Sequence, residues 1–125
     1  MVIVIDDNKD LADIICRLLG TMGYDATAAS NGKEGITKAK RQKPKVILCD
    51  IGMADMNGYE VARYVRQDNE LKDVYLVAIS GYSSQEDIKC SIEAGFDKHL
   101  SKPVSLDVLK MILDGVYNVK EYTPS

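Results

Sequence analysis

Short apolar runs alternate with longer segments of helical period along nearly the whole chain. The runs that predict strands are residues 2–5, 24–29, 46–49, 75–79 and 98–101. The first, third and fourth runs are apolar at successive positions, which is typical of strands buried on both faces of a parallel sheet. Regular alternation of strand and helix therefore predicts an α/β fold, a doubly wound five-stranded parallel sheet with helices on both faces.

The boundaries of the helices are also marked in the sequence. Pairs with the spacing of an N-cap residue and an acid that reaches back to it predict helix starts at Asn31 with Glu34, Asn57 with Glu60, and Ser83 with Glu86. Ser105 is expected to open the last helix, and Gly23 to end the first one in a left-handed conformation.

Polar residues stand where four of the apolar runs stop. Asp6 and Asp7 follow VIVI, Asp50 follows VILC, Ser80 follows YLVAI, and Lys102 follows HLS. In an open parallel sheet the ligand site lies outside the carboxyl ends of the strands, so these side chains are expected to converge. Clustered carboxylates repel one another, and Mg²⁺, which takes oxygen ligands, would hold them together. The ammonium and the hydroxyl are then available to bind an anion.

Length and charge limit the class of protein. The chain has 125 residues, the size of one domain, with a formal net charge of -3 and a pI near 5.1. This balance argues against direct binding of nucleic acid, which needs a basic surface. No apolar run approaches the ~18 to 20 residues of a membrane span, so a cytoplasmic protein without membrane contact is expected. The expected division is a domain over residues 1–119 and a C-terminal tail or linker over residues 120–125.

Each of these residues also has an ordinary structural interpretation. Asp6, Asp7 and Asn8 could cap the first helix, because Asp and Asn are favoured at that position. Asp50, Ser80 and Lys102 could each be a turn or surface residue. Taken together, however, these interpretations require independent coincidences at four strand ends. The odd number and wide spacing of Cys16, Cys49 and Cys90 predict reduced core cysteines rather than disulfides or a metal site.

Five motifs carry a resemblance to a known family. They are IDDN at residues 5–8, LCDIGMADMNGYE at 48–60, AISGY at 78–82, GF at 95–96 and SKP at 101–103. In this order and at these intervals, the chain resembles the receiver domain of bacterial two-component response regulators over essentially its whole length.

The resemblance implies a phosphoacceptor switch that receives its phosphoryl group from a histidine kinase or phosphotransfer protein. Asp50 would accept the group, while Lys102 and Ser80 would bind the phosphoryl oxygens. Mg²⁺ would be held by Asp7, Asp50 and the carbonyl of Gly52, with Asp6 acting through water. The surface of the fourth helix and fifth strand would change in response, in a monomer or weak dimer that is a signalling domain rather than an enzyme.

The chain departs from the family pattern at two positions. Ala54 stands where many receivers have Pro, and His99 stands where many have Tyr or Phe. His99 is either a polar residue on an edge strand or a switch side chain coupled to Ser80. Histidine there resembles receivers fused to hybrid histidine kinases, and both a stand-alone regulator and a domain of a longer protein remain open.

Two alternative functions use related chemistry on a related fold. A phosphatase of the haloacid dehalogenase type also has an Asp nucleophile and Mg²⁺, but that family has a second Asp two residues later, where this chain has Gly52. A flavodoxin-like carrier would need a hydroxyl-rich phosphate loop after the first strand, where DDNKD would repel a phosphate.

Overall fold

The computed structural model describes residues 1–118 and confirms the expected fold. Five parallel strands form one sheet in the order β2-β1-β3-β4-β5. The strands are β1 (Val2–Ile5), β2 (Ala26–Ala29), β3 (Val46–Asp50), β4 (Tyr75–Ser80) and β5 (Lys98–Ser101). The helices are α1 (Lys9–Thr21), α2 (Gly32–Gln42), α3 (Gly58–Gln67), α4 (Gln85–Ala94) and α5 (Leu106–Asn118). The predicted tail over residues 120–125 lies outside the described residues, so the domain boundary stays a prediction.

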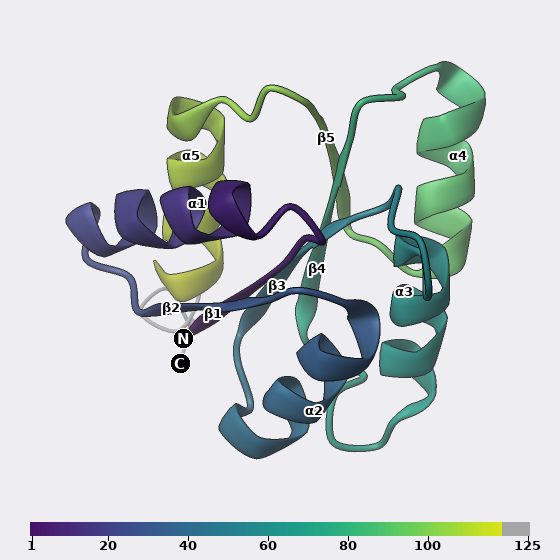
Figure 1. The fold of residues 1–125 in the computed structure, drawn as a ribbon, viewed down its shortest axis with the longest axis horizontal. Helices are drawn as coiled ribbons and strands as arrows, with labels where there is room; N and C mark the ends of the chain where they lie inside the picture. Colours follow the sequence, from purple (N-terminus) through teal and green to yellow (C-terminus); the bar gives the residue numbers. More distant parts are fainter. Residues whose placement is uncertain (119–125) are drawn as a thin grey trace, which may run out of the picture.

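The helices cover the two faces of the sheet, α1 and α5 on one side and α2, α3 and α4 on the other (Figure 1). Each face has its own apolar core: Leu19, Leu109 and Leu113 pack on the first, and Val61 and Val65 on the second. From β1 the chain continues to β2 on one side of the sheet, and from β3 it continues to β4 and β5 on the other side. The loops that leave the carboxyl ends of β1 and β3 therefore separate. That separation is the usual place for a ligand site in such a sheet.

The predicted helix starts are mostly confirmed. Asn31 accepts a hydrogen bond from the backbone of Glu34, and Asn57 and Glu60 form a reciprocal capping box. The prediction for α4 was wrong by one residue, because Ser84 and Asp87 form its capping box. The helix begins at Gln85, and the hydroxyl of Ser83 contacts a side chain of β5 instead. The second strand is also shorter than predicted, starting at Ala26.

The predicted ends of α1 and α5 agree with the structure. Gly23, just after α1, has φ +93°, and the Ser105 carbonyl accepts the first helical bond of α5.

Burial corrects one further expectation, that the cysteines lie in the core. Ile14 of α1 is 51% exposed. Cys90 is exposed on α4 rather than in the core, whereas Cys49 is fully buried and burial raises the pKa of its thiol. Cys16 is half-buried, and all three cysteines are free thiols. Within residues 1–118, none of the helices has the length and apolar character that a membrane span requires.

Candidate functional site

The structure brings together the polar residues that follow the strands. Asp6 and Asp7 come directly after β1, and Asp50 is the last residue of β3. One oxygen from each of these three carboxylates lies within 4.8 Å of the others. Asp6 and Asp50 are buried, while Asp7 is exposed. The adjacent central strands β1 and β3 thus place three acids at the edge where the winding direction changes.

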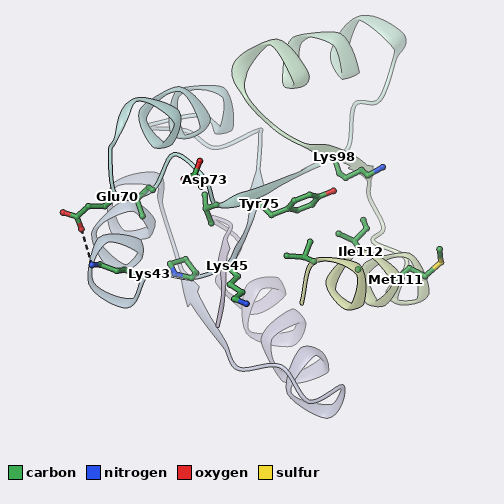
Figure 2. A pocket seen from close by; sticks show the side chains of 13 residues that line it. Lys43, Lys45, Glu70, Asp73, Tyr75, Lys98, Met111 and Ile112 are labelled. Carbon is green, nitrogen blue, oxygen red and sulfur yellow. Dashed lines mark ion pairs between the residues drawn. The ribbon is translucent and has the colours of Figure 1, made fainter. Parts of the chain in front are cut away.

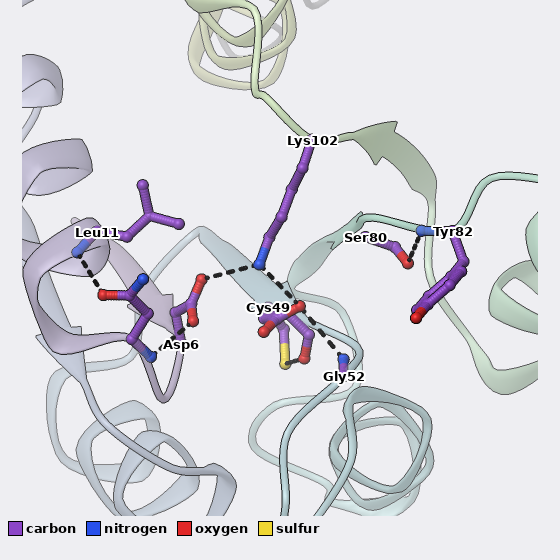
Figure 3. A network of polar contacts seen from close by, with 9 residues as sticks. Asp6, Leu11, Cys49, Gly52, Ser80, Tyr82 and Lys102 are labelled. Atoms are coloured by element: carbon purple, nitrogen blue, oxygen red, sulfur yellow. Dashed lines mark hydrogen bonds and ion pairs between the residues drawn. The ribbon is translucent and has the colours of Figure 1, made fainter.

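Backbone groups fix the orientation of the first acid. The Asn8 N–H donates to Asp6 Oδ1 at 2.9 Å, and the Asn8 side chain in turn accepts a bond from the Leu11 N–H (Figure 3). Asn8 is therefore the residue of this segment that caps α1. The capping interpretation holds for Asn8, whereas Asp6 and Asp7 face the cluster.

Lys102 extends from the end of β5 to the acids (Figure 3). Its Nζ lies 3.5 Å from Asp6 Oδ2 and 3.3 Å from Asp50 Oδ1. Both carboxylates are almost fully buried, so solvent screens these ion pairs less than surface pairs. The ammonium compensates part of the repulsion among the three acids. The sequence predicted the convergence of these residues, but not that Lys102 would also pair with Asp6.

The loop after β3 holds Asp50 from the other side. The Gly52 N–H donates to Asp50 Oδ1 at 3.2 Å. The loop passes so close to the start of α3 that a Cβ at Gly58 would lie 2.7 Å from the Ile51 Cα and 2.8 Å from the Asp50 carbonyl oxygen. Because both contacts are to backbone, only glycine fits at position 58, and the loop can return directly to α3.

Ser80 ends β4 beside this cluster. It is 4% exposed, and its Oγ accepts a hydrogen bond from the Tyr82 N–H at 3.0 Å (Figure 3). His99 of β5 contacts Ser83, Ser91 and the Tyr82 carbonyl rather than solvent alone. No sequence signal marks either Ser83 or Ser91 as a partner of this ring, because the spacing around Ser83 predicted a helix cap and Ser91 has no motif around it.

The acids and the nearby backbone fit a hard divalent cation. Three carboxylates offer oxygen atoms to a common point, and oxygen is the ligand that Mg²⁺ requires. Asp6 already contacts Lys102 and the Asn8 N–H, whereas Asp7 is exposed beside the other two acids. The donor set therefore fits Mg²⁺, with Asp7 the more accessible of the two acids after β1.

The crowding of the acids has a consequence for stability without metal. Burial, with the nearby charges of Asp50 and Asp7, raises the pKa of Asp6 from 3.8, against the opposing effects of the Asn8 N–H and Lys102. A folded-state pKa above the unfolded one means that ionisation of Asp6 destabilises the fold, starting as the pH rises through the unfolded value.

We therefore expect Asp6→Asn to raise the free energy of unfolding of the metal-free protein at about pH 7. The gain should shrink as the pH falls through the folded-state pKa of Asp6, because the wild-type carboxyl in the native protein then becomes neutral, as the amide of the variant already is. Urea unfolding with a chelator present, at neutral and at progressively lower pH, measures the difference. A variant that is less stable than wild type at neutral pH would contradict this account of the acid cluster.

A hollow of about 770 Å³ lies at the opposite end of the sheet, between α5 and the starts of β3 and β4 (Figure 2). Its walls include Tyr75 and Ile112, with Lys43, Lys45 and Lys98 among the lining residues. None of the strand-end acids lines it. The volume of this hollow therefore does not locate the candidate site. The site is identified by the chemistry of the clustered side chains.

Comparisons with known proteins agree with this geometry. The pattern of the response regulator receiver domain matches residues 2–114. The polar-differentiation response regulator DivK of Brucella anthropi is 27% identical over 105 residues, which cover 84% of this chain and 85% of DivK. The sensor histidine kinase RcsC of Salmonella typhimurium is 31% identical over 113 residues, covering 90% of this chain but 12% of RcsC.

Solved structures show the same similarity. The receiver domain of the Francisella response regulator 1452 has a TM-score of 0.87 and 28% identity, covering 95% of this chain and 97% of that one. The chemotaxis protein CheY4 of Vibrio cholerae has a TM-score of 0.86 and 26% identity, covering 92% and 96%. The chain therefore belongs to the response regulator receiver domain family, the phosphoacceptor switches of two-component and phosphorelay signalling.

Proposed function

We propose that Asp50 is the phosphoacceptor and that its donor is a phosphohistidine on a histidine kinase or phosphotransfer protein. The observation that carries this assignment is the position of Asp50: at the end of β3, within 3.3 Å of Lys102 and clustered with Asp6 and Asp7. A carboxylate oxygen of Asp50 attacks phosphorus, the phosphorus–nitrogen bond of the donor breaks, and the donor imidazole leaves. The product is an acyl phosphate on Asp50.

The residues around Asp50 have separate roles in this transfer. Lys102 and the Gly52 N–H both contact Oδ1, which leaves Oδ2 for the attack on phosphorus. After transfer, the Lys102 ammonium can pair with one of the negatively charged phosphoryl oxygens, and the Ser80 hydroxyl can donate a hydrogen bond to another. Asp7, Asp50, the Gly52 carbonyl and, through water, Asp6 would hold Mg²⁺, which would neutralise charge on the phosphoryl oxygens.

The donor protein must cover the surface around Asp50 to deliver the group. A hollow of about 500 Å³ beside the site is lined by Lys102, Pro103 and residues of α1, including Ile14 and Leu18. This hollow shares Lys102 with the acid cluster, so a donor seated on it would lie next to Asp50. The exposure of Ile14, which helix packing within the domain does not explain, is consistent with contact to that donor.

Signal output is proposed to start at Ser80 and pass to His99. In the parallel register Ala78 lies beside His99 and Ser80 beside Ser101, so the side chains of Ser80 and His99 project from the same face of the sheet. Phosphorylation adds about 1.5 to 2 negative charges next to Ser80. Movement of Ser80 toward the phosphoryl group would vacate space on the face that His99 shares, and would alter the α4 and β5 surface.

The experiment that tests this function is incubation of the purified protein with Mg²⁺ and a small phosphoramidate. A receiver domain gains one stable phosphoryl group, measured by intact mass. Sustained turnover of a generic phosphate ester without a mass gain would instead support the phosphatase alternative. A yellow purified protein with a flavin spectrum would support the electron carrier, and either of these results would contradict the proposal.

A further inference from the structure

The hollow at the amino ends of β3 and β4 has the size and lining of a small-molecule site. Its volume of about 770 Å³ lies within the range of about 300 to 1,000 Å³ that is usual for such sites. The segments that lead into β3 and β4 form one wall, and α5 forms the other (Figure 2). The apolar surface of this amino-end hollow comes from Pro44, Leu71, Val74, Ile112 and Val116.

The wall beside β4 is held in place by hydrogen bonds of the domain itself. The Arg66 side chain donates to the carbonyls of Lys72 and Val74, each at 2.7 Å. The Tyr75 N–H donates to the Lys45 carbonyl at 2.9 Å, which joins the segments before β3 and β4. The hollow is therefore shaped before any ligand arrives, as most small-molecule sites are.

Gly115 leaves the α5 side of the hollow without a side chain. It lies in the interior of α5, is exposed and lines the hollow, and a Cβ added to it would meet no heavy atom within 4 Å. Glycine inside a helix is less favourable than alanine, and packing among residues 1–118 does not require glycine here. The missing side chain keeps the hollow wide and lets a bound molecule approach the helix backbone closely.

The charged groups around the hollow are unevenly distributed. At one end the Lys43 ammonium lies 3.8 Å from the Glu70 carboxylate, and Asp73 lies toward the same side (Figure 2). The ammonium of Lys45 lies 5.3 Å from the centroid of a tyrosine ring of α5. At the other end Lys98 is exposed, and it forms no ion pair with any residue that the structure describes. A positive charge is thus uncompensated at that end of the hollow.

Tyr75 adds a hydrogen-bond donor to this positive end. Its ring lines the hollow, and its hydroxyl points toward the side from which Lys98 projects (Figure 2). Within the described part of the chain the hydroxyl has no hydrogen-bond partner. Burial, together with the charge of Asp97, raises the pKa of Tyr75, so the hydroxyl keeps its proton near neutral pH and can donate it. An ammonium and a hydroxyl at one end of an apolar hollow suit a carboxylate.

We propose that the amino-end hollow binds a small amphipathic carboxylate. The carboxylate contacts Lys98 and the Tyr75 hydroxyl, and the apolar body packs between α5, at Ile112 and Gly115, and the segment that leads into β4. One uncompensated ammonium suits a monoanion, because a phosphate group needs more donors. The site lies at the opposite end of the sheet from Asp50, so this binding does not depend on the proposed phosphoryl transfer.

The first test is a titration of the purified protein with octanoate, a carboxylate with a short apolar chain, followed by calorimetry and by amide chemical shifts. We expect a single saturable site, with the largest shifts around Tyr75, Lys98 and Gly115. Octan-1-ol and octylammonium have the same chain without the negative charge, and both should bind more weakly. Absence of saturable octanoate binding, or equally tight binding of octylammonium, would overturn the proposal.

The second test fills the hollow from α5. Gly115→Leu should remove saturable binding of octanoate, because the new side chain occupies the open space beside the helix. Gly20→Leu is the matched control, since Gly20 is also an exposed helical glycine whose Cβ would meet no atom within 4 Å, but it does not line the hollow. Octanoate should raise the unfolding temperature of wild type and Gly20→Leu but not of Gly115→Leu. Equal octanoate affinity of the two leucine variants would contradict the site.

The third test removes the positive charge. Lys98→Gln should weaken octanoate binding by about fivefold, the upper end for an exposed ion pair, and leave the binding of octan-1-ol unchanged. Lys33→Gln, which removes an exposed lysine of α2 that does not line the hollow, should bind both compounds like wild type. An unchanged octanoate affinity in Lys98→Gln would contradict the assigned position of the carboxylate.

A second copy of the chain is the competing occupant of the hollow, and sedimentation distinguishes it from a small ligand. Wild type without octanoate should sediment as the same species as Gly115→Leu, because the hollow is then open in both proteins to solvent or to the new side chain alone. If wild type forms a dimer that Gly115→Leu abolishes, the hollow is an interface between copies, and the proposal of a small carboxylate is wrong.

Discussion

Asp50→Asn is expected to abolish phosphorylation by small donors as well as by a protein donor. The amide keeps the size of the side chain and can still accept from the Gly52 N–H, but it is not a competent nucleophile for phosphorus. It also loses the charge that pairs with Lys102. Intact mass after incubation with Mg²⁺ and a phosphoramidate should show one added phosphoryl group for wild type and none for the variant.

A control separates the loss of the acceptor from a change in the loop. Asp55 is an exposed acid in the same segment between β3 and α3, and it is absent from the carboxylate cluster. Asp55→Asn should therefore be labelled at close to the wild-type rate. Labelling of Asp50→Asn as fast as wild type would show that another residue accepts the group, and the assignment of Asp50 would be wrong.

Asp7→Asn is expected to weaken Mg²⁺ binding by at least about tenfold, which corresponds to about 1.4 kcal/mol. The proposed site uses Asp7 as a direct ligand, and replacing its carboxylate by an amide removes a charge next to a divalent cation. Asp6→Asn should have a smaller effect, because Asp6 is proposed to act through water and already pairs with Lys102. Calorimetric titration of the three proteins with Mg²⁺ gives the comparison.

The appropriate control is Asp13→Asn, an exposed acid on α1 outside the cluster, which tests whether a general loss of negative charge weakens binding. Its dissociation constant should stay close to that of wild type. Equal dissociation constants for wild type, Asp6→Asn and Asp7→Asn would contradict the metal site. A larger effect of Asp6 than of Asp7 would reverse the assignment of the direct ligand.

Much of the fold could be predicted from the sequence because its signals are local. Runs such as residues 46–49 and 75–79 are apolar at successive positions, which is typical of strands buried on both faces, and each is followed by an amphipathic helix. Parallel pairing then places all strand ends at one edge. The convergence of Asp6, Asp50 and Lys102 follows from that topology alone, which is why the acid cluster was predictable without coordinates.

Positions where two local solutions compete were decided by tertiary contacts. The sequence around Ser83 and Ser84 offers two overlapping capping spacings, with Glu86 and with Asp87. The structure uses the second, and the hydroxyl of Ser83 contacts His99, which is 16 residues away in the chain. No local propensity distinguishes these alternatives, because the competing partner comes from β5.

Local signals were enough to locate the strands to within a few residues and the polar groups at their ends, because hydrophobic period and capping chemistry act over a few neighbouring residues. The exposure of Ile14 and Cys90 and the burial of Ser91 depend instead on contacts between elements that are distant in the chain. A helical period defines a face, but the neighbouring elements decide how wide a part of it is covered. The same holds for the hydrogen bonds of His99, whose partners come from separate segments that only folding brings together.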